Sequence, residues 1–135
     1  MEEGLTMMKV FGMRLLVSDY AASAHFWRDL VGFTAKFDDA SIGYGYFELG
    51  AFALELFVRD GFYSALGLEI PPVVEQHQTV IDIQVDDVDA TYAELVAQGV
   101  PSIAAPVDRS EWRARTAHVS DPDGYILELY TSLQS

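Results

Sequence analysis

Two glutamates occupy matching places in two strand-like segments of this 135-residue chain. Glu55 lies in "ALELF" (residues 53–57), and Glu128 lies in "GYILELY" (residues 124–130). Apolar residues flank both, and a carboxylate that is buried without a partner is costly. A carboxylate can instead hold a cation or an arginine, or act as a general base. We therefore expect Glu55 and Glu128 to face a cleft rather than the core.

The alternation of side chains along the predicted strands defines the cleft face. It carries Gly12, Arg14, Leu16, Ala53, Glu55, Phe57, Val80, Asp82, Gln84, Ile126, Glu128 and Tyr130. The opposite face is uniformly apolar, as a sheet face under a helix should be. The mixed face is what a binding site needs and a core does not.

The sequence around these strands repeats. "LLVSDYAASAHFWRDLVGF" (residues 15–33) aligns with "IQVDDVDATYAELVAQGV" (residues 83–100). In each segment a strand ends in valine, an aspartate begins a helix and a glycine ends it, namely Val17, Asp19 and Gly32, then Val85, Asp87 and Gly99. Aspartate is a good N-cap, and glycine is a good C-terminal stop.

Three strand-like runs follow each helix. They are residues 33–37, 44–49 and 52–58, then residues 103–107, 113–119 and 125–130. We predict an α+β fold of two βαβββ repeats in a single domain, at about residues 9–58 and 78–131. The linker, residues 59–77, is predicted to be a loop with a short helical piece near residues 63–66. The halves, or two chains, should pack around a shared cleft.

Composition excludes several classes of protein. The net charge of −13 repels nucleic acid and anionic lipid, and no apolar run reaches membrane-spanning length. The N-terminus, "MEEGLTMMKV", is not a secretory signal, so we expect a cytoplasmic protein. There are no cysteines, so any metal would need oxygen or imidazole ligands.

Four motifs in order resemble the vicinal oxygen chelate superfamily of glyoxalases, extradiol dioxygenases, fosfomycin resistance enzymes and bleomycin resistance proteins. They are "SDYAASAHFWRDLVGF", "ALELF", "VDDVDATYAELVAQGV" and "DPDGYILELY". The likeness covers about residues 9–131. It implies mixed sheets curled around a ligand cleft, while the fold alone does not specify a reaction.

The resemblance also identifies where metal ligands would lie. Metal-dependent relatives take one ligand from the first strand and one from the last strand of each half. Glu55 and Glu128 match the last-strand positions, but the first-strand positions hold Gly12 and Val80, which cannot bind a metal. We therefore expect no metal cofactor. The alternative is a divalent metal on Glu55 and Glu128, with Asp82 as a third oxygen donor.

Arg14 is the residue that we expect to replace the metal's positive charge. Its planar guanidinium can bind a carboxylate bidentately and would hold Glu55, Glu128 or both. A salt bridge that only neutralises buried charges is the alternative role for Arg14. Two carboxylates without enough cationic partners would repel, and the pKa of one should rise.

Within the superfamily, the bleomycin resistance type fits best in size, acidity, "HFW" on the first helix and a tryptophan before the seventh strand. It implies a homodimer that sequesters a small organic molecule, either cationic or aromatic, as in antibiotic resistance. Trp112, in the polar run "DRSEWRAR", is either a contact surface or a lid over the core. The residues predicted to bind the ligand are Arg14, Tyr46, Glu55, Phe57, Asp82, Gln84, Trp112, Glu128 and Tyr130.

Two other functions stay open from the sequence. The chain could be a lyase, isomerase or dioxygenase, either metal-dependent or using Glu128 and His118 as an acid–base pair. His118 lies two residues after Thr116 on a predicted strand, so it could face the cleft. A ligand-sensing protein without turnover is the third possibility.

Overall fold

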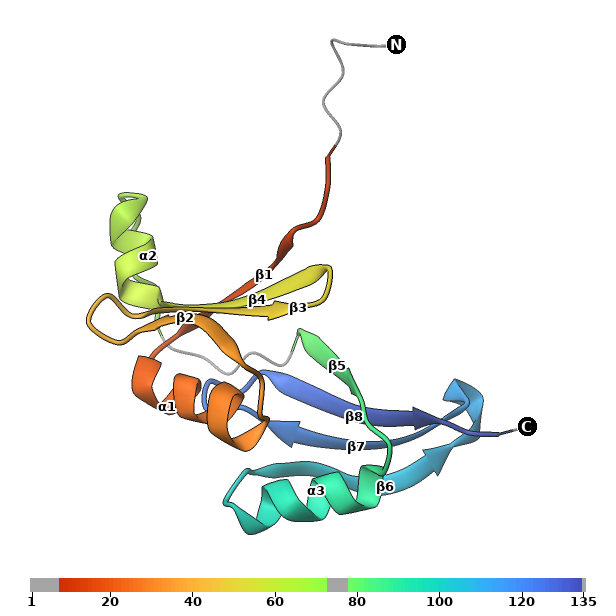
Figure 1. Ribbon diagram of the computed structural model, residues 1–135. Coiled ribbons are helices and arrows are strands. Elements are labelled where there is room, and N and C mark those ends of the chain that lie inside the picture. The colour runs from red at the N-terminus through yellow and green to blue at the C-terminus, as the bar shows by residue number, and fades with distance from the viewer. Residues whose placement is uncertain (1–7, 73–77, 135) are drawn as a thin grey trace, which may run out of the picture.

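The computed structural model describes residues 8–72 and 78–134 and contains two modules with the same plan (Figure 1). The first comprises β1 (Gly12–Val17), α1 (Tyr20–Ala24), the π-helix η1 (His25–Leu30), β2 (Ala35–Asp39), β3 (Tyr44–Leu49) and β4 (Phe52–Val58). After α2 (Arg59–Ala65), the second comprises β5 (Val80–Gln84), α3 (Val88–Ala97), β6 (Ser102–Arg109), the 3-10 helix η2 (Ser110–Trp112), β7 (Ala114–Ser120) and β8 (Ile126–Ser132).

Each module forms a four-stranded mixed sheet. The strand orders are β1-β4-β3-β2 and β5-β8-β7-β6, and in each the first strand runs parallel to the last while the other pairs are antiparallel. The predicted α+β fold of two βαβββ repeats is therefore confirmed. No helix in the described ranges is long and apolar enough to cross a membrane.

Several predicted boundaries need correction. The second strand begins at Ala35 rather than Phe33, because the N–H of Phe33 still donates to the carbonyl of Trp27 at the helix end. The last strand begins after Tyr125, whose N–H donates to the Asp121 carboxylate instead. In the linker, α2 covers residues 59–65 and continues directly from β4, so it begins earlier than the helical piece predicted near 63–66. Residues 73–77 lie outside the described ranges.

The helix boundaries follow the repeated sequence signals. The carboxylates of Asp19 and Asp87 accept from the backbone N–H groups of Ala22 and Ala90, at 3.1 and 3.0 Å. Gly32 and Gly99 take φ values of 91° and 93°, a left-handed conformation that favours glycine. The aspartate caps and glycine stops are thus confirmed.

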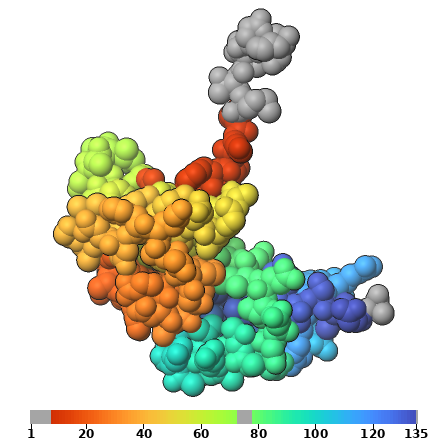
Figure 2. Space-filling view, viewed as in Figure 1, coloured from red at the N-terminus to blue at the C-terminus, as the bar shows by residue number. Residues whose placement is uncertain are grey.

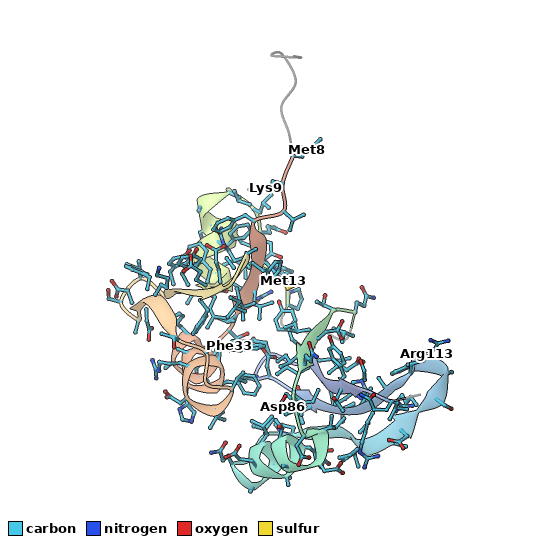
Figure 3. The ribbon with its side chains drawn as sticks, turned by 45° about the vertical axis from the view of Figure 1, so that its right-hand side comes forward. Met8, Lys9, Met13, Phe33, Asp86 and Arg113 are labelled. Carbon is cyan, nitrogen blue, oxygen red and sulfur yellow. The ribbon has the colours of Figure 1, made fainter. Side chains whose placement is uncertain are left out.

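The two modules share one core on their helix-facing sides. The apolar faces contribute Leu15 and Leu56 from the first sheet and Leu127 and Leu129 from the second, all essentially inaccessible to solvent. In the space-filling view the modules form two adjoining lobes (Figure 2). Phe33 lies between them, where Figure 3 labels it. Because this core uses the helix-facing sides, the polar face of each sheet lies away from it.

The π-helix η1 adds the largest side chain to this core. The N–H of Val31 donates to the carbonyl of Phe26, five residues earlier, which widens the helix by one residue in that turn. As a result, Phe26 and Trp27 are both buried, although they are neighbours in the sequence. The side chains also contact each other edge to face, with centroids 5.0 Å apart.

The turn "DPDG" between β7 and β8 joins the modules. Asp123 accepts from the N–H of Ser18 at 2.9 Å and from the hydroxyl of Ser23 at 3.2 Å, both in the first module. Asp121 accepts from the N–H groups of Asp123 and Tyr125 through Oδ1. The sequence identified this segment only as a turn, whereas it also makes polar contacts between the modules.

Asp121 is 2% exposed, and burial raises its pKa to about 6, against the opposing effect of the two backbone N–H donors. The indole N–H of Trp27 approaches the same carboxylate. Neither Nε1 of Trp27 nor Oδ2 of Asp121 completes a hydrogen bond within the described residues. An ionised Asp121 is therefore incompletely compensated in the core.

Candidate ligand-binding site

Three titratable side chains lie side by side across the second sheet. The register pairs Asp82 on β5 with Glu128 on β8, and Glu128 with His118 on β7. Because partners in register point to the same face, all three occupy the polar face. Nε2 of His118 lies 2.9 Å from Oε1 of Glu128, where the ring N–H can donate to the carboxylate. His118 therefore satisfies one oxygen of Glu128 in a partly buried setting.

Asp82 and Glu128 form a carboxylate pair. The pKa of Asp82 is raised, and burial is the largest cause. The charge of Glu128 and a hydrogen bond with Glu128 raise the pKa further, while the charge of His118 lowers it. The repulsion expected from two acids in one cleft therefore involves Asp82 and Glu128. A bound cation would relieve that repulsion.

A cavity of about 510 Å³ opens over this pair. Its lining is Val80, Asp82, Trp112, Arg113, Ala114, Glu128, Tyr130 and Ser132. Four of the residues predicted to bind a ligand therefore line one cavity: Asp82, Trp112, Glu128 and Tyr130. Gln84 lies farther along β5 and lines a separate, smaller cavity with apolar residues of both modules.

At the equivalent positions of the first sheet, the glutamate is paired with an arginine and a tyrosine instead of an aspartate and a histidine. Arg14, Glu55 and Tyr46 are in register there, as Asp82, Glu128 and His118 are in the second sheet. Nε of Arg14 lies 3.0 Å from Oε1 of Glu55, and the hydroxyl of Tyr44 donates to Oε2. Burial and this hydrogen bond raise the pKa of Tyr44 to about 12, so Tyr44 keeps its proton near neutral pH. Glu55 is therefore already neutralised and hydrogen-bonded on both oxygens.

The prediction for Arg14 can now be specified. Its partner is Glu55, and the described ion pairs include none between Arg14 and Glu128. The guanidinium also lies 5.9 Å from the ring centre of Phe57. The two glutamates of the opening motifs thus belong to two separate groups, and the cavity beside Glu128 is not lined by Glu55.

The chain's own residues do not fit the metal site of the metal-dependent relatives. A Cβ at Gly12 would lie only 2.1 Å from the carbonyl oxygen of Ala53, so this position of β1 cannot carry a ligand side chain without a backbone shift. The side chain of Val80 has no atom that can bind a metal, and the carboxylate of Glu55 already bonds Arg14 and Tyr44. Across residues 8–72 and 78–134, no group of three His, Asp or Glu side chains is placed to hold a metal ion.

A residue that the sequence reasoning did not single out supports the cavity wall. The guanidinium carbon of Arg109 lies 4.7 Å from the ring centre of Trp112, and Nε of Arg109 donates to Oγ1 of Thr116 at 3.0 Å. The three-residue spacing of Arg109 and Trp112 was visible in "DRSEWRAR", and a 3-10 turn places such residues together.

The arrangement permits two kinds of chemistry. The carboxylate pair can hold a cation, and the bond between Glu128 and His118 can pass a proton. The catalytic role suggested for Glu128 and His118 stays a prediction.

Comparison with known proteins agrees with the fold. A sequence model of the Glyoxalase/Bleomycin resistance protein/Dioxygenase superfamily matches residues 9–129. The uncharacterized protein YraH of Bacillus subtilis is 34% identical over 128 residues, which cover 93% of this chain and 100% of YraH.

Solved structures extend the comparison. A glyoxalase/bleomycin resistance protein/dioxygenase from Nocardioides is 20% identical, with a TM-score of 0.78 over 97% of this chain and 87% of that one. The antibiotic binding protein TnmS3 from Streptomyces sp. CB03234 is 25% identical, with a TM-score of 0.68 over 97% of this chain and 99% of its own.

Proposed function

Because the chain belongs to the Glyoxalase/Bleomycin resistance protein/Dioxygenase superfamily, we propose that it binds a small organic cation with an aromatic group, without a metal, in the cavity of its second sheet. The observation that carries this proposal is the pair Asp82 and Glu128, side by side in the lining of that cavity. Two adjacent carboxylates favour a cationic guest, and the net charge of −13 attracts one from a distance.

The remaining lining suits an aromatic group. Trp112 and Tyr130 provide ring surface, while Val80 and Ala114 provide aliphatic surface. Trp112 is 52% exposed, so burial against a ligand would remove a large apolar area from water. A cavity of about 510 Å³ is within the usual range for small-molecule sites.

One relative supports a sequestering role. TnmS3, named as an antibiotic binding protein, matches almost the whole chain at 25% identity. A carrier needs only to hold its ligand, and the cavity offers charge and aromatic surface for that purpose. We therefore propose binding rather than turnover, with drug sequestration as its physiological form.

We also propose that the chain works as a homodimer whose second copy covers the polar sheet faces. Several large apolar side chains on or beside these faces are exposed to solvent: Phe11, Phe37, Val80 and Trp112. Burying them would stabilise an association. The predicted ligand contacts Arg14, Tyr46 and Phe57 of the first sheet would then reach the ligand from the partner copy.

A matched series of probes tests the proposed charge preference. The compounds 1-naphthylmethylamine, 1-naphthalenemethanol and 1-naphthoate share one ring system and differ in charge. We expect isothermal titration calorimetry at low salt to rank the amine tightest, by about tenfold or more over the alcohol, since charge-assisted hydrogen bonds contribute more than neutral ones. Equal affinity for the three probes, or a preference for naphthoate, would rule out a cation site.

A further inference from the structure

The indole of Trp112 contacts two side chains, and about half of the residue is exposed to solvent. The guanidinium carbon of Arg109 lies over one face of the ring, 4.7 Å from its centre. The ring of His118 meets the indole edge to face, with centroids 6.4 Å apart and planes at 89°. Trp112 is half exposed and lines the cavity, so a large part of the indole surface is available to a ligand.

Arg109 is itself held in place. Its Nε donates to the hydroxyl of Thr116, whose side chain is completely buried. Although the chain has 21 acidic residues, Arg109 forms no ion pair with any acid of the described ranges. Its guanidinium is therefore directed to the indole and the threonine, a stacked arrangement for which a planar cation is suited.

The backbone fixes the same segment. Trp112 closes the 3-10 turn η2, and the next residue, Arg113, takes the left-handed conformation with φ 57°. The N–H of Arg113 donates to Ser110, and its carbonyl accepts from Leu133 beyond β8. Figure 3 places Arg113 at the far end of the second module. Arg109 of β6 pairs with Ala114 of β7, and Leu133 bonds Arg113, so the turn is anchored at both ends.

We propose that Arg109 is a positioning residue that holds Trp112 as a rigid stacking platform, so that the site selects a flat aromatic cation over a globular one. The ligand's ring lies on the exposed surface of the indole, and its amine lies toward Asp82 and Glu128. This inference rests on the proposed function and adds the shape of the ligand to its charge. A pre-ordered platform binds more tightly because less side-chain freedom is lost on binding.

Two amines of equal charge separate shape from charge. The compound 1-naphthylmethylamine carries its amine on a flat ring, and 1-adamantanemethylamine carries it on a globular cage. Calorimetry with the wild-type protein, Arg109→Ala, Arg109→Lys and the charge-matched control Arg28→Ala measures both affinities. Arg28 is exposed and pairs with Asp29 and Asp38 in the first module.

We expect the wild type and Arg28→Ala to prefer the naphthyl probe. Arg109→Ala should lower the affinity for the naphthyl probe by about tenfold and change the affinity for the adamantyl probe by less than about twofold. The variant loses the cation–π contact and the fixed orientation of Trp112, and only a stacked ligand depends on these. Arg109→Lys keeps the charge but not the planar fork, so it should fall between wild type and alanine.

Acrylamide quenching gives a readout that does not require a ligand. The chain has two tryptophans, and Trp27 is fully buried, so quenching reports on Trp112. In the folded Arg109→Ala variant we expect stronger quenching than in wild type. Unchanged quenching together with unchanged selectivity would overturn the role of Arg109 and leave the cation site intact. If the wild type binds neither amine, the proposed function fails, and the selectivity inferred here fails with it.

Discussion

Replacing Asp82 by Asn and Glu128 by Gln in one variant lowers the affinity for 1-naphthylmethylamine by about a hundredfold, and each single replacement by about tenfold, since each removes one charge-assisted hydrogen bond. The substitutions keep the size of the side chains, so the shape of the cavity is preserved. Calorimetry at 50 mM and 300 mM salt measures the effect. The wild-type affinity should fall at the higher salt, while the double variant should respond little.

The matched control for this variant is Glu48→Gln with Asp60→Asn. It also removes two negative charges, but from exposed side chains outside the cavity, which pair with Lys36 and Arg59. The control should bind within about twofold of wild type, because solvent and salt screen exposed charges that do not line the cavity. A double cavity variant that bound as tightly as this control would show that the acids only supply a general negative field.

The second large effect concerns the buried carboxyl group between the modules. Burial raises the pKa of Asp121 to about 6, while an unfolded chain ionises the same group near its ordinary pKa of 3.8. The folded protein therefore binds the proton more tightly than the unfolded protein between these values. The contribution of Asp121 to the free energy of unfolding should therefore decrease by about 2 kcal/mol as pH rises from about 4 to 7, and it should then stay constant above pH 7.

Asp121→Asn isolates this contribution. Asparagine keeps the oxygen that accepts from Asp123 and Tyr125 but cannot ionise. Urea unfolding of wild type and variant at pH 4, 5, 6 and 7 gives the difference in free energy of unfolding. The wild type should lose about 2 kcal/mol of stability relative to the variant between pH 4 and pH 7. Asp60→Asn is the control, and a difference for Asp121→Asn that stays constant with pH would contradict the account.

The internal repeat explains how one module came to carry the site. Arg14 and Asp82 occupy equivalent positions of the two sheets. Each is paired with a glutamate, Arg14 with Glu55 and Asp82 with Glu128. In the first module, the arginine and a tyrosine hydroxyl occupy the carboxylate. In the second, a like charge stands where the arginine would be, so the carboxylate pair stays available. Asp82 in place of Arg14 and Thr116 in place of Tyr44 thus distinguish the proposed cation site from the closed salt bridge of the first module.

Much of the fold could be predicted because it depends on local signals. Aspartate caps and glycine stops are readable from residue type, and Asp19, Gly32, Asp87 and Gly99 act as expected. The alternation of polar and apolar residues assigned the two faces of each sheet correctly, since the side-chain period of a strand is two residues. The same alternation placed Asp82 and Glu128 on the polar face, whereas their pairing follows from the strand register of the structure.

The rest depended on how elements pack. The helical periodicity could not predict the π-helix, which buries Phe26 and Trp27 together. The turn "DPDG" gave no sign that Asp123 would reach Ser18 and Ser23, which are 105 and 100 positions away in the chain. The alternation also could not show that Glu55 and Glu128 would lie in separate groups, because face assignment does not specify how the two sheets are placed.

The central claim is that an organic cation binds between Asp82, Glu128 and the ring of Trp112. The most direct measurement is a titration of the ¹⁵N-labelled protein with 1-naphthylmethylamine, followed by two-dimensional NMR. The account predicts that the indole N–H signal of Trp112 and the backbone signals around Asp82 and Glu128 shift most, with that of the buried Trp27 almost unchanged. Saturable shifts centred elsewhere in the chain, or none at millimolar probe, would contradict it.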